Sequence, residues 1–213
     1  MSVLLVASGA VSLGEKVEEM SESGKVLTKS EAAYKGFDLF MRAWQEAFRN
    51  AEVLATPLLL TGQNYTKRNI QKLERQVRQT PLSTVIIANT HDGFNSQRFK
   101  HFDVANDNDL VGAKFAEMGA TKYIICTNVD GVKDKYGNTI PEFNHLEQLN
   151  DINFYKNTQN NGVGGMEGKL KTAIRTALTG IEVHIVDGKD KEALIKVHNG
   201  EQVGTRIHFK RTK

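Results

Sequence analysis

Short runs of consecutive apolar residues alternate along the chain with segments in which apolar residues recur at helical spacing. Such runs are typical of strands buried on both faces of a parallel sheet, and the recurring pattern is typical of amphipathic helices. We expect strands at residues 3–7, 53–60, 84–88, 123–127, 181–186 and 205–209. We expect helices around residues 28–48, 70–77, 109–118, 170–178 and 189–197. Strands alternating with helices predict an α/β fold whose mainly parallel sheet is covered on both faces.

Local signals refine these boundaries. Thr28 and Glu31 have the spacing of a capping box, which predicts a helix start. Pro57 lies inside a predicted strand, which favours the start or the edge of a sheet for that residue. Gly180 is expected to close the helix that precedes it. The polar residues 13–28, rich in Gly, Glu and Lys, predict a surface loop.

The length and composition indicate an ordinary globular protein. The 213 residues, 39% hydrophobic and 25% charged, fit one α/β domain or at most two small ones, and we expect one domain over residues 1–213. The net charge is +3, and Lys and Arg alternate with acidic residues, so we expect neither a nucleic-acid partner nor a membrane partner. No run approaches the roughly 18 apolar residues of a membrane span.

One cysteine and six histidines bear on redox compartment and metal binding. Cys126 lies in an apolar run, where we expect a buried strand residue, and a single thiol favours a reducing compartment. We therefore expect a cytoplasmic protein. The histidines have no metal-ligand spacing and no partner cysteines, so no metal site built from protein side chains is expected.

Polar residues follow directly after most of the predicted strands. Ligands bind beyond the carboxyl ends of the strands in open α/β sheets, so these residues mark the expected binding edge. They are Ser8-Gly9, Thr61-Gly62, Asn89-Thr-His-Asp92, Thr127-Asn-Val-Asp130 and Asp187-Gly188.

A glycine-rich segment, Gly162-Val-Gly-Gly-Met-Glu-Gly-Lys169, precedes a predicted helix. Its four glycines let the backbone approach a ligand closely, and the helix start directs free N–H groups towards it. The ammonium of Lys169 could reach a phosphate from the beginning of that helix. The spacing is not that of a Walker motif, and a plain loop before a helix is the alternative interpretation.

Three further segments have both a structural and a chemical interpretation. Asn106-Asp-Asn-Asp109 would cap a helix, or Asn108 would orient a substrate while Asp109 holds a catalytic lysine. Asp92 would form a turn, or bind the amino group of a zwitterionic substrate. Ser8-Gly9-Ala10 would cap a helix, or bind a carboxylate through its N–H groups and hydroxyl.

The order of these segments resembles that of the glutamate 5-kinases of the amino acid kinase family. It is also similar to the kinase half of the pyrroline-5-carboxylate synthases. The likeness extends over nearly all of residues 3–209. The segments that carry it are Val6-Ala-Ser-Gly-Ala-Val11, Leu59-Leu-Thr61, Asn89-Thr-His-Asp92, Asp107-Asn-Asp109, Thr127-Asn-Val-Asp-Gly131, Gly164-Gly-Met-Glu-Gly-Lys-Leu170, Gly180-Ile-Glu-Val183 and Val203-Gly-Thr205.

This resemblance implies the amino acid kinase fold, a three-layer α/β/α sandwich. It implies ATP-dependent phosphorylation of the side-chain carboxylate of L-glutamate to L-glutamyl 5-phosphate, the first step of proline biosynthesis. ATP and glutamate would be the ligands, with Mg²⁺ bound through ATP rather than by a protein cage. A homo-oligomer built on residues 33–48 is also implied.

The resemblance further implies roles for individual residues. Glutamate binding would fall to Ser8, Gly9, Asp92 and Asn108. Catalysis would depend on Lys169, the lysine that stabilises the transition state, and on Asp109, which organises the site. The residues expected to bind ATP are Thr127, Asn128, Val163, Gly164, Gly165, Met166 and Lys169.

Departures from the family pattern leave two alternatives open. The resemblance implies that the chain begins at the strand after the family's first strand and its lysine-bearing loop, and we expect no accessory domain after Phe209. Asn128 stands where the family has an acid, and Gly168 stands where it has a threonine. The alternatives are a kinase of another small carboxylate, such as N-acetylglutamate, and a non-catalytic homologue that binds a nucleotide or an amino acid.

Overall fold

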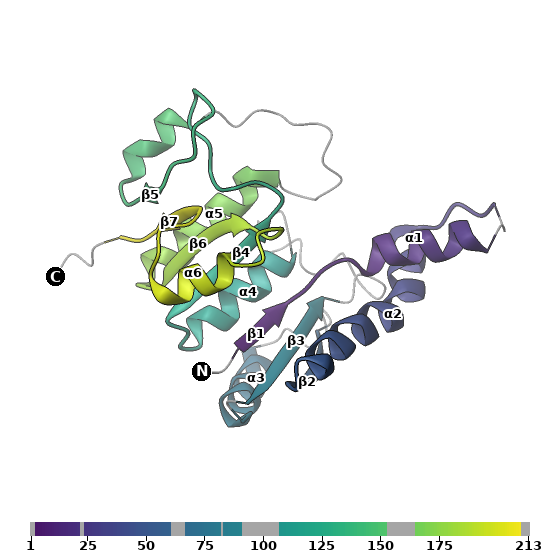
Figure 1. Cartoon of the computed structure of the whole chain (residues 1–213). Coiled ribbons are helices and arrows are strands. Elements are labelled where there is room, and N and C mark those ends of the chain that lie inside the picture. The colour runs from purple at the N-terminus through teal and green to yellow at the C-terminus, as the bar shows by residue number, and fades with distance from the viewer. Residues whose placement is uncertain are drawn as a thin grey trace. The chain divides into compact units, whose positions relative to one another are not determined.

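The computed structural model describes residues 3–21, 24–60, 67–81, 83–90, 107–152 and 165–209. The chain divides into two compact units, Met1–Asp103 and Val104–Lys213, and each has its own sheet and helices (Figure 1). The expectation of a single domain over residues 1–213 stays a prediction.

The sheet of the first unit has three parallel strands in the order β1-β3-β2. They are β1 (Val3–Val6), β2 (Leu54–Leu60) and β3 (Thr84–Thr90), close to the predicted positions. Val6 pairs with Ala88, and Leu54 pairs with Thr84. Strand β2 lies at an edge of this sheet, which confirms the prediction made from Pro57.

Helices α1 (Ala10–Met20) and α2 (Lys29–Asn50) lie side by side (Figure 1). The predicted loop over residues 13–28 is therefore wrong for residues 13–20, which are helical. The two helix backbones touch at glycines, because a Cβ on Gly14 would overlap the carbonyl oxygen of Ala32 and one on Gly36 would overlap that of Ala10. Glu18 is buried in α1 and forms an ion pair with Lys35 of α2. A polar and glycine-rich sequence thus forms a helix here because small residues allow close packing.

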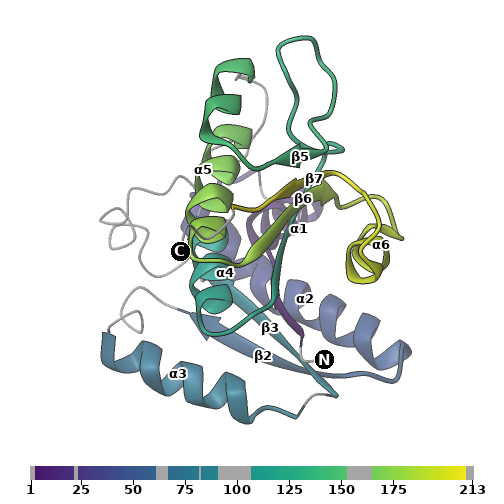
Figure 2. The same ribbon diagram turned by 90° about the vertical axis from the view of Figure 1, so that its left-hand side faces the viewer.

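Helix α2 begins at the predicted cap and packs on the sheet. Thr28 and Glu31 form a complete capping box, which confirms that prediction. The buried core of this unit combines Phe40 and Met41 of α2 with Ile87 of β3. Helix α3 (Lys67–Gln79) lies on the other side of the sheet (Figure 2).

Some apolar residues of α2 stay outside this core. Tyr34 and Leu39 are exposed. The homo-oligomer expected on residues 33–48 stays a prediction.

The second unit contains a four-stranded sheet in the order β4-β6-β7-β5. Its strands are β4 (Lys122–Thr127), β5 (Glu142–Phe143), β6 (Glu182–Asp187) and β7 (Thr205–Ile207). The β6–β7 pair is antiparallel, whereas the β4–β6 and β5–β7 pairs are parallel. The predicted α/β class and mainly parallel pairing are confirmed.

Helices cover both faces of this second sheet. Helices α4 (Asp107–Glu117) and α5 (Gly165–Leu178) lie on one face, and α6 (Ala193–Asn199) lies on the other (Figure 2). The larger core joins Leu170 of α5 to Ile185 of β6, and the smaller core joins Val197 of α6 to Val186. This unit therefore shows the expected three layers.

Two predictions near the carboxyl ends of β6 and β4 were wrong. Helix α6 begins at Ala193 rather than near Lys189, because Asp187 and Asp190 accept backbone N–H bonds that form turns between β6 and the helix. Cys126 lies in β4 as expected but is exposed rather than buried, since it is close to the carboxyl end of the strand.

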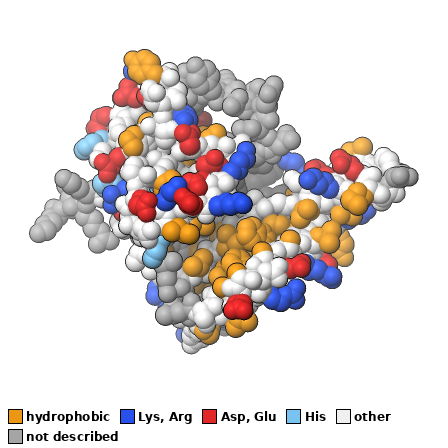
Figure 3. Space-filling view, in the orientation of Figure 1, with side chains coloured by type: hydrophobic (Ala, Val, Ile, Leu, Met, Phe, Trp, Pro, Cys, Tyr) orange, Lys and Arg blue, Asp and Glu red, His pale blue; other side chains and the backbone are white. Residues whose placement is uncertain are grey.

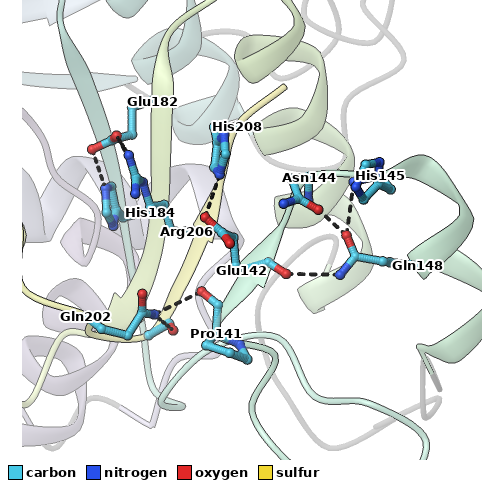
Figure 4. Close-up of polar contacts among 11 residues, drawn as sticks. Pro141, Glu142, Asn144, His145, Gln148, Glu182, His184, Gln202, Arg206 and His208 are labelled. Atoms are coloured by element: carbon cyan, nitrogen blue, oxygen red, sulfur yellow. Dashed lines mark hydrogen bonds and ion pairs between the residues drawn. The ribbon is translucent and has the colours of Figure 1, made fainter. Parts of the chain in front are cut away.

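Sequence patterns did not indicate the short strand β5 or the 3₁₀ helix η2 (Leu146–Asp151). Two glutamine side chains hold the β5 backbone in place (Figure 4). The Gln148 amide donates to the carbonyl oxygen of Glu142 at 3.0 Å, and its oxygen accepts from the backbone N–H of Asn144. Gln202 donates to the carbonyl oxygen of Pro141 at 2.9 Å. A two-residue strand thus depends on side-chain hydrogen bonds that have no periodic signature.

Charged side chains of both signs are mixed over the second unit on the face shown in Figure 3. Several are paired, as Lys133 is with Asp130 and Lys135 with Asp151. Among the described residues of this unit, basic side chains on this face are interspersed with acidic ones.

Candidate functional site

An aspartate and a lysine from neighbouring helices form the centre of the candidate site in the second unit. Asp109 lies in the first turn of α4, and Lys169 lies near the start of α5. The Lys169 ammonium donates to Oδ2 of Asp109 at 3.1 Å, although the two residues are 60 positions apart. Their side chains are only 20% and 12% exposed, so solvent screens this pair less than it screens a surface ion pair.

The Asp109–Lys169 pair holds a positive charge in a fixed position near the start of α5. The hydrogen bond to the Asp109 carboxylate restricts the rotamers of Lys169. An ammonium has three N–H donors, so the others can bind an anion. The first backbone N–H groups of α5 have no partners within the helix and carry partial positive charge. Together these groups can neutralise the charge of a phosphate.

The start of α5 has no bulky side chain at its first residue. Gly165 has φ = +52°, a left-handed conformation that favours glycine, and a Cβ there would meet nothing within 4 Å. Met166 is half-buried and packs against the larger core. Gly165 and Met166 were both predicted to bind ATP, and that role stays a prediction.

The carboxyl ends of β4 and β6 lie next to each other and present polar groups. Thr127 ends β4, and its hydroxyl lies 3.4 Å from Oδ1 of Asn128. The backbone N–H of Gly188, just after β6, donates to the carbonyl oxygen of Thr127 at 2.7 Å. Thr127 is half-buried and Asn128 is exposed, so both can contact a ligand at this edge.

The first unit carries the other predicted group. Ser8 and Gly9 are exposed between β1 and α1, and Gly9 has φ = +132° at the N-cap position of α1. No side chain of the described residues caps this helix. Ser8-Gly9 thus stands at a helix start, and its predicted binding of a carboxylate stays a prediction.

Asn89 supports this turn. The sequence placed it in a polar segment after a strand but gave it no role of its own. It is buried at the end of β3, and its side-chain amide donates to the carbonyl oxygen of Ala7 at 2.7 Å. The backbone N–H of Ala7 donates to the carbonyl oxygen of Ala88 at 2.9 Å. These bonds fix the residue before Ser8. A polar residue at a strand end was the only sequence signal for it.

Several predicted residues cannot be placed together. Asp92, Val163 and Gly164 lie outside the described residues. Asn108 is half-buried in the first turn of α4, beside Asp109. Ser8, Gly9 and Asp92 belong to the first unit and the other predicted residues to the second, so the expected meeting of the two groups stays a prediction.

Metal binding and membrane insertion can be checked only for the described part of the chain. There, no three His, Cys, Asp or Glu side chains gather closely enough to hold a metal ion. Within the same ranges, no helix has the length and apolar character needed to cross a bilayer.

Comparison with known proteins gives a family match and two kinds of relative. A family model described as "Amino acid kinase family" matches residues 5–187. The chain is 28% identical over 220 residues to a glutamate 5-kinase of Prochlorococcus marinus and 31% identical over 215 residues to one of Syntrophotalea carbinolica. It is 27% identical over 228 residues to a delta-1-pyrroline-5-carboxylate synthase of Mesembryanthemum crystallinum.

These matches cover almost all of the chain but only part of each relative. They include 97%, 95% and 97% of the chain, yet 59%, 56% and 32% of the three relatives respectively. Among solved structures, an isopentenyl phosphate kinase of T. acidophilum superposes with a TM-score of 0.58 at 16% identity. That likeness covers 97% of this chain and 83% of the other, and it shows a shared fold. The family resemblance seen in the order of the sequence motifs is confirmed.

Proposed function

Because the chain belongs to the amino acid kinase family, we propose that it is a phosphotransferase that uses ATP to phosphorylate a small carboxylate. The preferred acceptor in this proposal is the side-chain carboxylate of L-glutamate, which would yield L-glutamyl 5-phosphate for proline biosynthesis. The names of the most similar relatives support the acceptor. The observation that carries the proposal is the Asp109–Lys169 pair at the start of α5.

The proposed chemistry requires two anions to approach each other. A carboxylate oxygen attacks the γ-phosphorus of ATP, and the bond from that phosphorus to the β,γ-bridging oxygen breaks. Catalysis of such a transfer is mostly positioning and neutralisation of charge. When bound through ATP, Mg²⁺ supplies charge neutralisation at the phosphates.

Lys169 has the central role in this mechanism. Its ammonium would contact the phosphoryl oxygens and stabilise the negative charge that develops on them. Asp109 would hold that ammonium in one direction, so the charge is already in place when the reactants meet. The N–H groups at the start of α5 add partial positive charge on the same side.

The remaining predicted residues would bind the two substrates. The Ser8 hydroxyl and the backbone N–H groups at the start of α1 would donate hydrogen bonds to the α-carboxylate of glutamate. Asp92 would pair with its amino group, and Asn108 would orient the molecule. Thr127 and Asn128 would contact ATP at the carboxyl end of β4.

The proposal is tested by trapping the product. The chain is incubated with ATP, Mg²⁺ and one acceptor in the presence of hydroxylamine, which converts an acyl phosphate into a coloured hydroxamate. L-glutamate should give hydroxamate faster than N-acetylglutamate or D-glutamate. Faster hydroxamate formation from N-acetylglutamate would contradict L-glutamate as the acceptor and favour a kinase of another small carboxylate.

Calorimetric binding of ATP without any acyl phosphate would contradict the phosphotransferase proposal. That result would favour a non-catalytic homologue that binds a nucleotide. Lys169→Ala should lose hydroxamate formation, because the charge that stabilises the transferred phosphoryl group is gone. Lys171→Ala is the matched control, because Lys171 is on the same helix but exposed and paired with Glu167.

A further inference from the structure

Tyr123 of β4 makes a direct contact with the residue that holds Lys169. Its phenolic hydroxyl donates to the backbone carbonyl oxygen of Asp109 at 3.0 Å. The side chain of the same Asp109 accepts from the Lys169 ammonium at 3.1 Å. A strand, a helix start and a lysine are thus linked in series by two hydrogen bonds.

A glycine in α4 makes room for this phenol. Gly112 lies one turn after Asp109, on the same side of the helix. A Cβ at Gly112 would lie 2.6 Å from the Tyr123 hydroxyl oxygen and within 2.9 Å of two of its ring carbons. Glycine in a helix interior is unfavourable compared with alanine, so its presence here needs a compensating gain. Close approach of the tyrosine to the helix backbone is such a gain.

The hydroxyl of Tyr123 is a permanent donor in this position. Burial and the neighbouring negative charge of Asp109 raise the pKa of the phenol well above its ordinary value. The proton therefore stays on the oxygen throughout the pH range in which the protein would work. Its hydrogen bond to the Asp109 carbonyl persists over that whole range.

The hydrogen bond from Tyr123 reaches the first turn of α4. Asp109 lies in the first turn of α4, and helix ends fray more readily than helix interiors. A bond from a strand in the core ties this turn to the sheet. Small displacements of a positioned charge cost much of its effect on a reaction, so the placement of the turn matters for Lys169.

We propose that Tyr123 is a positioning residue for phosphoryl transfer: its hydroxyl holds the first turn of α4, and through Asp109 it sets the direction of Lys169. This inference rests on the proposed function for its catalytic consequence. The alternative is a purely structural tyrosine, because the ring of Tyr123 also packs against the larger core.

The test compares two variants that each lose one hydroxyl bond to a backbone carbonyl. Tyr123→Phe keeps the ring and removes only the donor to Asp109. Thr176→Val is the matched control, since buried Thr176 donates to the carbonyl oxygen of Thr172 at 2.9 Å within α5, the helix of Lys169. Both variants should lose a similar, small amount of thermal stability.

Their kinetics should differ. In Tyr123→Phe, kcat should fall about tenfold while KM for ATP and for the acceptor stays within about twofold, because the charge is misplaced but the substrate contacts remain. Thr176→Val should turn over like the parent. Equal kcat in Tyr123→Phe and the parent, or an equal loss in both variants, would overturn the inference.

A double variant tests whether Tyr123 acts through Asp109. If it does, adding Tyr123→Phe to Asp109→Asn should slow the reaction no further. Losses that multiply would mean that the tyrosine acts independently, and the inference would be wrong.

A measurement without turnover separates this inference from the proposed function. Magnetic resonance of the ¹⁵N-labelled lysine ammonium groups reports how fast Lys169 exchanges its protons with water. That exchange should be faster in Tyr123→Phe than in the parent and in Thr176→Val. If the parent phosphorylates no acceptor, the proposed function fails, and unchanged exchange in Tyr123→Phe would independently refute the positioning role.

Discussion

Asp109 and Lys169 lie 60 positions apart in the sequence and meet at 3.1 Å at the starts of two neighbouring helices. Both side chains are largely removed from solvent. A buried charge is stable only when it is paired, so each residue determines where the other can be. The pair provides a positive charge of fixed direction beside a helix start that attracts anions.

The carboxylate of Asp109 should be needed for turnover more than for binding. Asp109→Asn keeps the shape of the side chain but removes the charge that directs Lys169. We expect kcat to fall by about 10- to 100-fold with little change in KM for ATP, measured by hydroxamate formation. Glu117→Gln, at the other end of α4, is the control and should keep full activity. Similar losses in both variants would show a general effect on the helix.

Asn89 should matter for the acceptor rather than for the transfer step. Asn89→Ala leaves the Ala7 carbonyl oxygen without its side-chain partner and loosens the turn that carries Ser8. We expect KM for the acceptor to rise several-fold, with a loss of about 1–2 kcal/mol in the free energy of unfolding. Steady-state kinetics and urea unfolding measure the two effects. Asn199→Ala, at the exposed last residue of α6, should change neither. Unaltered kinetics in Asn89→Ala would remove Asn89 from the site.

Close packing of α1 against α2 predicts a stability defect. Gly36→Ala would place a methyl group on the carbonyl oxygen of Ala10, so the two helices must separate. We expect the free energy of unfolding to fall by about 1–3 kcal/mol, measured with urea. Ser12→Ala, on the exposed side of α1, should stay within about 0.5 kcal/mol of the parent. If Gly36→Ala unfolds like the parent, the two helices do not pack as described.

The lowered pKa of Glu182 predicts how the free energy of unfolding changes at acid pH. Burial raises the pKa of Glu182, but hydrogen bonds from His184 at 2.9 Å and from Arg206 at 3.0 Å outweigh it and lower the pKa to about 2 (Figure 4). A carboxyl group with a lowered pKa in the folded state adds stability above its ordinary pKa of 4.5, and that stability is lost as the pH falls towards 2.

Glu182→Gln should therefore destabilise the protein by about 1–3 kcal/mol at neutral pH. The difference from the parent should shrink as the pH is lowered from 4.5 to about 2, and unfolding followed by circular dichroism measures it. Glu147→Gln, an exposed carboxylate in η2, should track the parent at every pH. A constant difference between Glu182→Gln and the parent over this range would contradict the linkage.

Periodicity in the sequence predicted most of the fold. Apolar runs located all the longer strands, and the Thr28–Glu31 spacing located the start of α2. The start of α1 after Ser8-Gly9 was expected, but its continuation over residues 13–20 was missed. Its contacts there depend on Gly14 and Gly36, and a glycine that permits close packing looks the same in sequence as a glycine in a loop. Strand β5 was missed because Gln148 and Gln202, rather than an apolar pattern, hold it in place.

The candidate site was predictable to a smaller extent. Two segments at predicted helix starts, residues 106–109 and 162–169, pointed with the family resemblance to Asp109 and Lys169, and the structure brings these two together. Tyr123 gave no signal, because it sits in an apolar strand where an aromatic residue is usual, and its hydroxyl contact depends on the tertiary position of α4. The role of Asn89 likewise depends on the register between β1 and β3.

The central claim is that Lys169 supplies the positive charge for phosphoryl transfer, and the direct measurement is kcat for hydroxamate formation from L-glutamate in two lysine variants of α5. Lys169→Ala should lower kcat by at least about 100-fold, with KM for glutamate close to that of the parent. Lys171→Ala should match the parent in both constants. A Lys169→Ala variant that turns over like the parent would contradict the account.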